Sequence, residues 1–322
     1  MTNKLTIFGK EIIDDKTIEQ LKNCLLEDSI GAITADGHYG YNHPIGGAVA
    51  YKNHISVSGV GFDIACGNKA VKTSVKWEDI QKDISPIMDK VVSKISFGVG
   101  RPNKKRVEHS VLDRIKNANF EPQRKLYDLA YEQIGTVGSG NHFVDLFVDQ
   151  EGFVWIGVHF GSRGFGHKTA TGFMSIAQGM QFGDKAKQGS MDDKPILLDI
   201  NTYEGQAYIE AMTLAGDYAY AGRDLVVENV LSILGNPEVL FSVHNHHNFA
   251  WKETHFGEDY WVVRKGCTPA FPDQYGFIGA NMRDQSVIIK GVDSELSKDG
   301  LYSTVHGAGR IMSRTQAAGK IS

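Results

Sequence analysis

The sequence predicts an α+β protein that forms one domain over residues 1–322, with mixed β-sheets and packed helices. Short apolar or alternating segments, typical of strands, are interspersed with longer helical patterns, without the regular alternation of a doubly wound sheet. The 322 residues suffice for a sizeable core, and no stretch has the composition of a linker. The 36 glycines lie among valine, isoleucine and aromatic residues, which argues against low-complexity disorder.

The individual elements are predicted from the period of their apolar residues. Five segments alternate or run apolar over strand-like lengths, namely 47–57, 142–149, 153–160, 259–266 and 285–292. Three longer segments have helical patterns, namely 15–26 after an aspartate pair, 111–133 with a break near Pro122, and 204–234, the longest.

Composition argues against several classes of protein. The net charge of −4 gives no overall signature of nucleic-acid binding, so any such surface would be local. No apolar run reaches the roughly 18 residues of a membrane span, and the N-terminus lacks the order of a signal peptide. The 3 cysteines lie in dissimilar contexts, which favours free thiols in a reducing cytoplasm over a disulfide framework.

Candidate metal ligands gather in glycine-rich segments and at the ends of predicted strands. They lie in VGFDIACG, SGNHF, VHFGSRG and VHNHHN, and are Asp63, Cys66, His142, His159, His244, His246 and His247. Each taken singly is better explained as a buried or hydrogen-bonded residue. Together, a thiolate, imidazoles and a carboxylate suit manganese, zinc, cobalt or nickel. The spacing contains no CxxC pair, so it indicates a catalytic site recruited from distant segments rather than a zinc finger.

Three further segments combine basic residues with glycine and so favour phosphate. They are RKGCTPAFP with Arg264 and Lys265, FGSRGFGHK with Ser162, Arg163 and Lys168, and HGAGRIMSR with Arg310 and Arg314. Each alone is equally well explained as solvated charge, but beside a metal cluster they indicate phosphoryl chemistry. His306 is flanked by small residues and is open to a large ligand. Its neutral imidazole is a competent nucleophile toward phosphorus when a divalent metal neutralises the phosphate.

With GFDIACG, GSGNHF, HFGSRGFGH, HHNFAWKE, RKGCTPAFP and HGAGR in this order, the chain resembles the RtcB-type RNA ligases from residue 35 to residue 314. The resemblance implies an α+β fold of that family and a cytoplasmic enzyme that uses GTP and two Mn²⁺ ions. Such an enzyme joins RNA 2′,3′-cyclic phosphate or 3′-phosphate ends to 5′-hydroxyl ends in RNA repair or tRNA splicing. A histidine attacks GTP to give a histidine–GMP adduct, the guanylate moves to the RNA 3′-phosphate, and the 5′-hydroxyl displaces GMP.

The resemblance also assigns roles to residues of this chain. His306 matches the guanylylated histidine. One manganese position matches Asp63, Cys66 and His142, and the other matches Cys66, His159 and His247, so the Cys66 thiolate would bridge. The stretches that match guanylate-binding residues are Asn141, His142, Phe143, Val144, Asp145, His247, Asn248, Gly279, Ala280, Asn281, Met282, Ser286, His306, Gly307, Ala308 and Gly309. Arg264 and Lys265 match a basic motif that faces RNA phosphates.

Some positions depart from the family pattern. Asp145 stands where the family often has glutamate, and Asn281 and Arg283 replace a serine and a glycine of the guanylate loop. The family's C-terminal tail with its guanine-contacting lysine is expected to be missing, because Lys320 lies in no matching motif. Two alternatives therefore stay open: a metal-dependent RNA cyclic phosphodiesterase, and an RNA-end-binding paralogue without ligation. The natural RNA and any activating protein partner are not assigned by the sequence.

Overall fold

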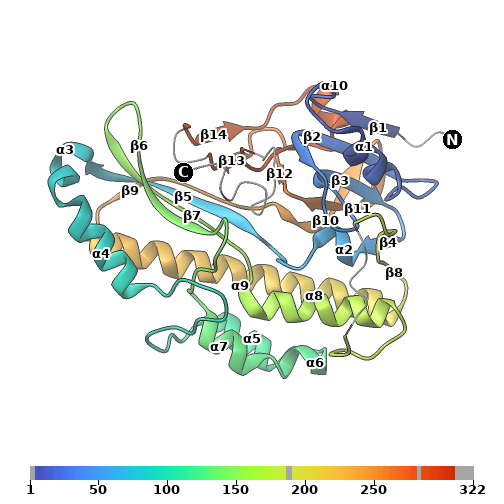
Figure 1. Cartoon of the computed structure of the whole chain (residues 1–322), viewed down its shortest axis with the longest axis horizontal. Helices are drawn as coiled ribbons and strands as arrows, with labels where there is room; N and C mark the ends of the chain where they lie inside the picture. The colour runs from blue at the N-terminus through green and yellow to red at the C-terminus, as the bar shows by residue number, and fades with distance from the viewer. Residues whose placement is uncertain (1–3, 186–190, 281–283, 309–322) are drawn as a thin grey trace, which may run out of the picture.

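The computed structural model describes residues 4–185, 191–280 and 284–308, and two main sheets organise this part of the chain (Figure 1). The five-stranded sheet has the order β1-β2-β3-β11-β10, with bounds Lys4–Ile7, Ile30–His38, Ile45–Tyr51, Glu258–Lys265 and Asn248–His255. The four-stranded sheet has the order β6-β7-β5-β9, with bounds Phe143–Val148, Phe153–Phe160, Gly67–Lys76 and Val239–His246. The other strands described form pairs: β4 (His54–Ser56) with β8 (Leu197–Asp199), β12 (Cys267–Pro269) with β15 (Ser303–Val305), and β13 (Tyr275–Ile278) with β14 (Val287–Lys290).

Helices cover one face of the four-stranded sheet. The long helix α9 (Tyr203–Ile233) packs against β5 and β7, and α8 (Arg163–Ala177) lies alongside it (Figure 1). The remaining helices described are α1 (Asp15–Lys22), α2 (Val57–Val60), α3 (Trp77–Ile80), η1 (Gln81–Asp83), α4 (Ile84–Lys94), α5 (Ser110–Lys116), α6 (Glu121–Arg124), α7 (Tyr127–Gln133) and α10 (Glu295–Asp299). The opposite face of the sheet is turned toward β13.

The predicted α+β class is confirmed, and most predicted strands are found. Residues 153–160 coincide with β7, and 142–149, 259–266 and 285–292 contain or overlap β6, β11 and β14. The prediction of one strand over 47–57 is wrong, because the chain bends at Lys52 and Asn53 and separates β3 from β4.

The helix predictions are confirmed in part, because α1 ends at Lys22 rather than at residue 26 and 111–133 forms three helices. Helix α9 matches the predicted 204–234, and its N-cap Thr202 accepts a hydrogen bond from the Gly205 amide. Within 111–133 the chain leaves the helical path at residues 117–120, between α5 and α6, and again at Lys125 and Leu126, between α6 and α7. Pro122 does not break a helix but lies in the first turn of α6, where its missing N–H costs nothing. No helix in the described segments combines the length and apolar character needed to cross a bilayer.

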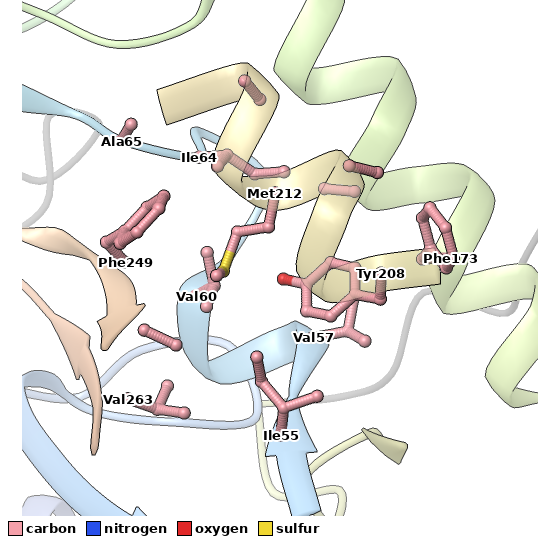
Figure 2. Packing of buried hydrophobic residues seen from close by; sticks show 14 of the residues in the cluster. Ile55, Val57, Val60, Ile64, Ala65, Phe173, Tyr208, Met212, Phe249 and Val263 are labelled. Carbon is pink, nitrogen blue, oxygen red and sulfur yellow. The ribbon is translucent and has the colours of Figure 1, made fainter. Parts of the chain in front are cut away.

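The principal core packs the helices α8 and α9 against α2, the helix that precedes the Asp63–Cys66 segment. Met212 and Tyr208 of α9 pack near Val57 and Val60 of α2, and Phe173 of α8 closes the same cluster (Figure 2). These side chains are buried, so the short helix α2 is held firmly against α8 and α9. The chain leaves α2 directly into the Asp63–Cys66 segment, so this packing fixes where that segment begins.

Candidate functional site

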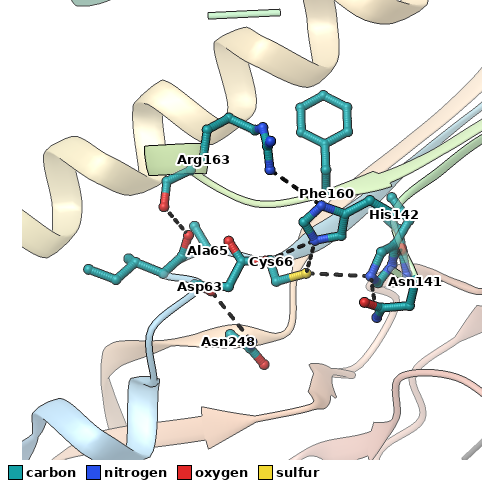
Figure 3. Close-up of polar contacts among 12 residues, drawn as sticks. Asp63, Ala65, Cys66, Asn141, His142, Phe160, Arg163 and Asn248 are labelled. Atoms are coloured by element: carbon teal, nitrogen blue, oxygen red, sulfur yellow. Dashed lines mark hydrogen bonds and ion pairs between the residues drawn. The ribbon is translucent and has the colours of Figure 1, made fainter. Parts of the chain in front are cut away.

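A tight turn between α2 and β5 carries Asp63 and Cys66. The Cys66 amide donates to the Asp63 carbonyl at 3.1 Å, and Ala65 between them has a φ of 60° in the left-handed region. The Ala65 amide donates to the carbonyl of Asn248 at 2.7 Å, which ties the turn to β10. This turn directs the Asp63 carboxylate and the Cys66 thiol toward His142 (Figure 3).

Asp63, Cys66 and His142 form the first group of candidate ligands. The Nε2 atom of His142 lies 3.0 Å from Oδ2 of Asp63 and 3.8 Å from Sγ of Cys66. Gly161 makes room for this carboxylate, because a Cβ at that position would lie 2.1 Å from Oδ1 of Asp63. Arg163 approaches the other side of the imidazole, with Nη1 3.5 Å from Nδ1 of His142 (Figure 3). Gly161, the first glycine of HFGSRG, is therefore needed here because any side chain would occupy the space of the Asp63 carboxylate.

Cys66 also belongs to a second group, with His159 and His247. Sγ of Cys66 lies 3.4 Å from Nε2 of His159, and the rings of His159 and His247 lie 5.0 Å apart. Nδ1 of His159 lies 2.6 Å from Oδ1 of Asn68, an acceptor that holds the proton on Nδ1 and leaves the lone pair of Nε2 facing the thiol. In each group the ligand atoms all lie within 4.8 Å of one another.

The histidines of VHNHHN lie at the end of β9 and point to two different sides of the chain. His244 and His246 point toward α9, where both accept hydrogen bonds from Arg223 at 2.8 Å. His247 follows the strand and joins the ligands, while its amide donates to the Cys66 carbonyl at 2.8 Å. Successive side chains of a strand alternate between faces, so the structure places His247, not its two neighbours, with Cys66 and His159.

Burial sets the protonation of these side chains. It lowers the pKa of His159 to about 3, with the nearby His142 adding to the effect. It also lowers the pKa of His247 well below its usual value, so both imidazoles are neutral near pH 7, the form that binds metals. Burial would raise the pKa of Asp63, but the hydrogen bond and charge of His142 outweigh it and lower that pKa. Burial raises the pKa of the Cys66 thiol well above its usual value, so a cation is needed to stabilise the thiolate.

These residues fit the binding of divalent cations. The buried Nδ1 of His247 has no hydrogen-bond partner among the described residues, as expected of a nitrogen that a cation engages. One sulfur, neutral imidazoles and one carboxylate form a donor set suited to borderline transition metals.

His306 lies beside the ligands on the segment after β15. Its ring lies 5.0 Å from that of His247. One carboxylate oxygen of Asp36 accepts both the His306 amide at 3.0 Å and the ring Nδ1 at 2.6 Å. Burial would raise the pKa of Asp36, but its contacts with His306 outweigh this effect and lower that pKa. The Nδ1–H of His306 therefore donates to a carboxylate, which leaves the lone pair on Nε2.

The predicted nucleotide-binding residues border this cluster. Nδ2 of Asn141 lies 3.3 Å from Nε2 of His159, and the ring of Phe143 stacks on that imidazole with centroids 5.5 Å apart. Oδ1 of Asn248 accepts the Gly266 amide at 2.7 Å. Val144 is buried in the sheet.

The segment around Ser286 is linked through Gly279 to the segment that carries His306. Oγ of Ser286 accepts the Ala280 amide at 3.1 Å, and Gly279 pairs with Gly307 through a parallel bridge. Ala308 is exposed. Burial raises the pKa of the Asp145 carboxylate. Asn281, Met282 and Gly309, which the sequence also assigns to the nucleotide, lie outside the described residues.

The two basic residues of RKGCTPAFP are not on the surface. Arg264 is 0% exposed, and its guanidinium donates to both oxygens of Glu253, at 2.6 and 3.0 Å. Lys265 donates to the carbonyls of Tyr41 and Ser58, and burial lowers its pKa to about 8. This burial gives Arg264 a structural role, which disfavours its predicted contact with RNA phosphates. For Lys265 that contact stays a prediction.

We expect Glu253→Gln to destabilise the fold by about 3–5 kcal/mol at pH 7, because it leaves the buried Arg264 cation without its counter-charge. The measurement is urea unfolding of the parent and variant. The pKa of Glu253 is lowered below its ordinary value of 4.5, chiefly because Arg264 overcomes the opposing effect of burial. The stability difference should therefore be complete above pH 4.5 and shrink as the pH falls below it.

The control for this variant is Glu258→Gln on the neighbouring strand. Glu258 pairs with Lys52 at 2.5 Å, but their side chains are 55% and 35% exposed. An exposed pair contributes at most about 1 kcal/mol. Equal losses from both variants would contradict the structural role of the buried pair.

The structure adds functional residues that the sequence did not reveal. Asp36 orients the ring of His306, Asn68 orients His159, and Arg223 binds the backbone beside the ligands. Asp36 has a weak signal in its glycine-rich context ADGHYG, and Asn68 in its position two residues after Cys66. Arg223 lies within a long helical pattern directly before Asp224, and nothing in the sequence sets it apart from other charged residues of the helix.

The chain matches the family described as "tRNA-splicing ligase RtcB" over residues 26–122 and 115–322. It is 32% identical over 314 residues to the RNA-splicing ligase RtcB of Escherichia coli strain K12, a match that spans 89% of this chain and 75% of the relative. It is 28% and 27% identical to the tRNA-splicing ligases RtcB of Archaeoglobus fulgidus and Thermococcus kodakarensis. Those matches span 97% and 94% of this chain, and 79% and 78% of the relatives.

Proposed function

Since the chain belongs to the RtcB family of RNA-splicing ligases, we propose that it is a GTP-dependent RNA ligase acting through a histidine–GMP adduct. The RNA ends it joins are a 3′-phosphate or 2′,3′-cyclic phosphate and a 5′-hydroxyl. The observation that carries the proposal is His306, whose ring is held by Asp36 through Nδ1 while it lies against the His247 ligand. The 3 free cysteines agree with a cytoplasmic location, which is part of the same proposal.

The first step follows from the orientation of His306. The lone pair on Nε2 attacks the α-phosphorus of GTP, the bond from that phosphorus to the bridging oxygen breaks, and pyrophosphate leaves. The ring becomes positively charged as the N–P bond forms. Asp36 accepts the Nδ1–H throughout, so its carboxylate stabilises this charge and keeps the ring aligned.

The two ligand groups would hold two Mn²⁺ ions that share Cys66. Asp63 and His142 complete one position, and His159 and His247 complete the other. Divalent cations there would neutralise phosphate charge and orient the reacting groups. The bridging role of Cys66 is supported by its place in both groups.

Ser286 also lines a cavity, whose lining includes neither His306 nor any residue of the two ligand groups. The cavity has a volume of about 950 Å³ and lies over the four-stranded sheet, lined in part by Ala70, Phe147, Trp155 and Phe277. This volume is within the range of small-molecule sites. Asp145 lies on the same face of the sheet as Phe147, two residues away on β6. Asp145 is not among the lining residues of the cavity, and its carboxylate would accept hydrogen bonds from the edge of a guanine bound between the cavity and His306.

In the later steps the guanylate passes to the RNA. The oxygen of an RNA 3′-phosphate attacks the phosphorus held on His306, and the N–P bond breaks to restore the imidazole. The 5′-hydroxyl of the second RNA then attacks the activated 3′-phosphate, a phosphodiester forms, and GMP leaves. A 2′,3′-cyclic phosphate must first be opened by water to the 3′-phosphate.

The test is incubation of the protein with α-labelled GTP and Mn²⁺, followed by denaturation and detection of label on the chain. Label that depends on Mn²⁺, and a joined product after addition of RNA ends, would support the proposal. Opening of a cyclic phosphate without label would indicate the phosphodiesterase instead. RNA binding without either reaction would indicate the non-ligating paralogue.

We expect Asp36→Asn to slow formation of the adduct by up to about 10⁴-fold, the loss that follows when the imidazole-orienting carboxylate of a catalytic triad becomes an amide. An amide is uncharged and presents an N–H as readily as a carbonyl, so it neither fixes the tautomer nor stabilises the charged ring. The rate of label incorporation measures the effect. Metal content should match that of the parent, because Asp36 belongs to neither ligand group. Adduct formation at the parent rate would show that Asp36 has no part in activating His306.

A further inference from the structure

Arg223 is a fully buried arginine on α9, behind the ligand cluster. Its side chain is 0% exposed, and it forms no ion pair with a carboxylate among the described residues. Its acceptors are two backbone carbonyls and two imidazole nitrogens. A buried cation without a direct counter-charge is costly, so the use of this guanidinium to donate only to neutral acceptors calls for a specific role.

Two of these hydrogen bonds reach the backbone beside metal ligands. Nη1 of Arg223 donates to the carbonyl of Ala65 at 3.0 Å and to that of Phe160 at 2.6 Å. Ala65 directly precedes Cys66, and Phe160 directly follows His159. One guanidinium nitrogen therefore ties the turn that carries the thiol to the end of β7 that carries the imidazole.

The other two hydrogen bonds reach strand β9. Nη2 lies 2.8 Å from Nδ1 of His246, and Nε donates to Nε2 of His244 at 2.8 Å. His246 directly precedes His247. Arg223 therefore contacts a chain neighbour of all three residues of the second group, Cys66, His159 and His247. In the first group it contacts a neighbour of Cys66 alone.

From this pattern we propose that Arg223 is a positioning residue that sets the geometry of the Cys66–His159–His247 cation position. The inference rests on the two-metal site of the proposed function. A planar guanidinium can donate in three fixed directions at once, whereas lysine presents a single point of charge. Loss of the fork would let the three segments shift relative to one another, and groups that orient ligands typically change metal affinity by about 10–100-fold.

The test is Co²⁺ titration of the full chain by calorimetry, with the thiolate-to-cobalt absorption recorded in parallel. The parent should bind two ions. Arg223→Met should weaken one of them by about 10–100-fold and change the thiolate absorption, while the other keeps most of its affinity. Arg223→Lys keeps the charge but not the fork, and should weaken the same ion. It carries the test if the methionine variant does not fold.

The matched control is Val230→Ala on the same helix. Val230 is 0% exposed within the apolar cluster under the four-stranded sheet, and it is not among the polar partners of the ligand segments. This variant should lose stability and keep both ions at parent affinity. Parent-like binding in the Arg223 variants, or an equal loss of affinity in Val230→Ala, would overturn the inference. A parent chain that binds no Co²⁺ or Mn²⁺ would instead overturn the two-metal site itself.

Discussion

We expect His306→Ala to abolish the covalent guanylate, because no other side chain in the described part of the chain presents an Asp36-oriented lone pair next to the ligand groups. The variant should still bind two metal ions, since His306 belongs to neither group. Label incorporation from α-labelled GTP and metal analysis of the same sample measure the two outcomes together. In the parent, the bond should be a phosphoramidate, stable in alkali and broken in acid.

The control is His54→Ala, at a histidine on β4 outside both ligand groups, which should form the adduct at the parent rate. Mapping the labelled peptide by mass spectrometry then identifies the residue that carries GMP. Lys265 is the competing nucleophile, because burial lowers its pKa to about 8 and so makes its amine easier to deprotonate. GMP on Lys265, or full labelling of His306→Ala, would refute the assignment.

The second large effect is expected for Cys66→Ser. Cys66 is the one residue common to both groups among the described residues, so its loss should weaken both cation positions at once. A hydroxyl is a poorer and usually protonated ligand, and we expect each affinity to fall by about 100-fold or more. His159→Ala should weaken one position only. Metal analysis after gel filtration, with isothermal titration, distinguishes the two patterns.

Cys24→Ser is the matched control for this variant. Cys24 is also a buried free cysteine, but it packs in the core and belongs to neither group. It should retain both ions. Should Cys66→Ser lose one ion and keep the other at parent affinity, the thiolate does not bridge.

The sequence allowed the ligand groups to be predicted because their chemistry is concentrated in short motifs. Asp63 and Cys66 share one turn, and His142 and His159 lie at the ends of adjacent strands that the apolar pattern already indicated. Asp36 could not be assigned, because its partner His306 lies 270 residues away in the chain. The local sequence around a single carboxylate does not reveal so distant a partner.

The burial of Arg264 was equally invisible in the sequence. A basic pair in a glycine-rich motif is typical of phosphate binding, and only the register of β10 and β11 brings Glu253 to Arg264. Helix α8 was missed for a related reason. Its glycines are unfavourable for a helix, but Gly172 is needed because a Cβ there would lie 2.1 Å from the ring of Phe182. Tertiary packing, not local propensity, decides such segments.

His244 and His246 lie on one face at the end of β9, and His247, the next residue along the chain, points to the other side. His244 and His246 belong to Arg223, and His247 belongs to the ligands. The roles of these histidines therefore depend on their phase along the chain as well as on their identity. Inserting or deleting one residue within β9 would exchange the two faces, whereas a change of two would restore the alternation. The length of β9 is therefore constrained along with the histidines at its end.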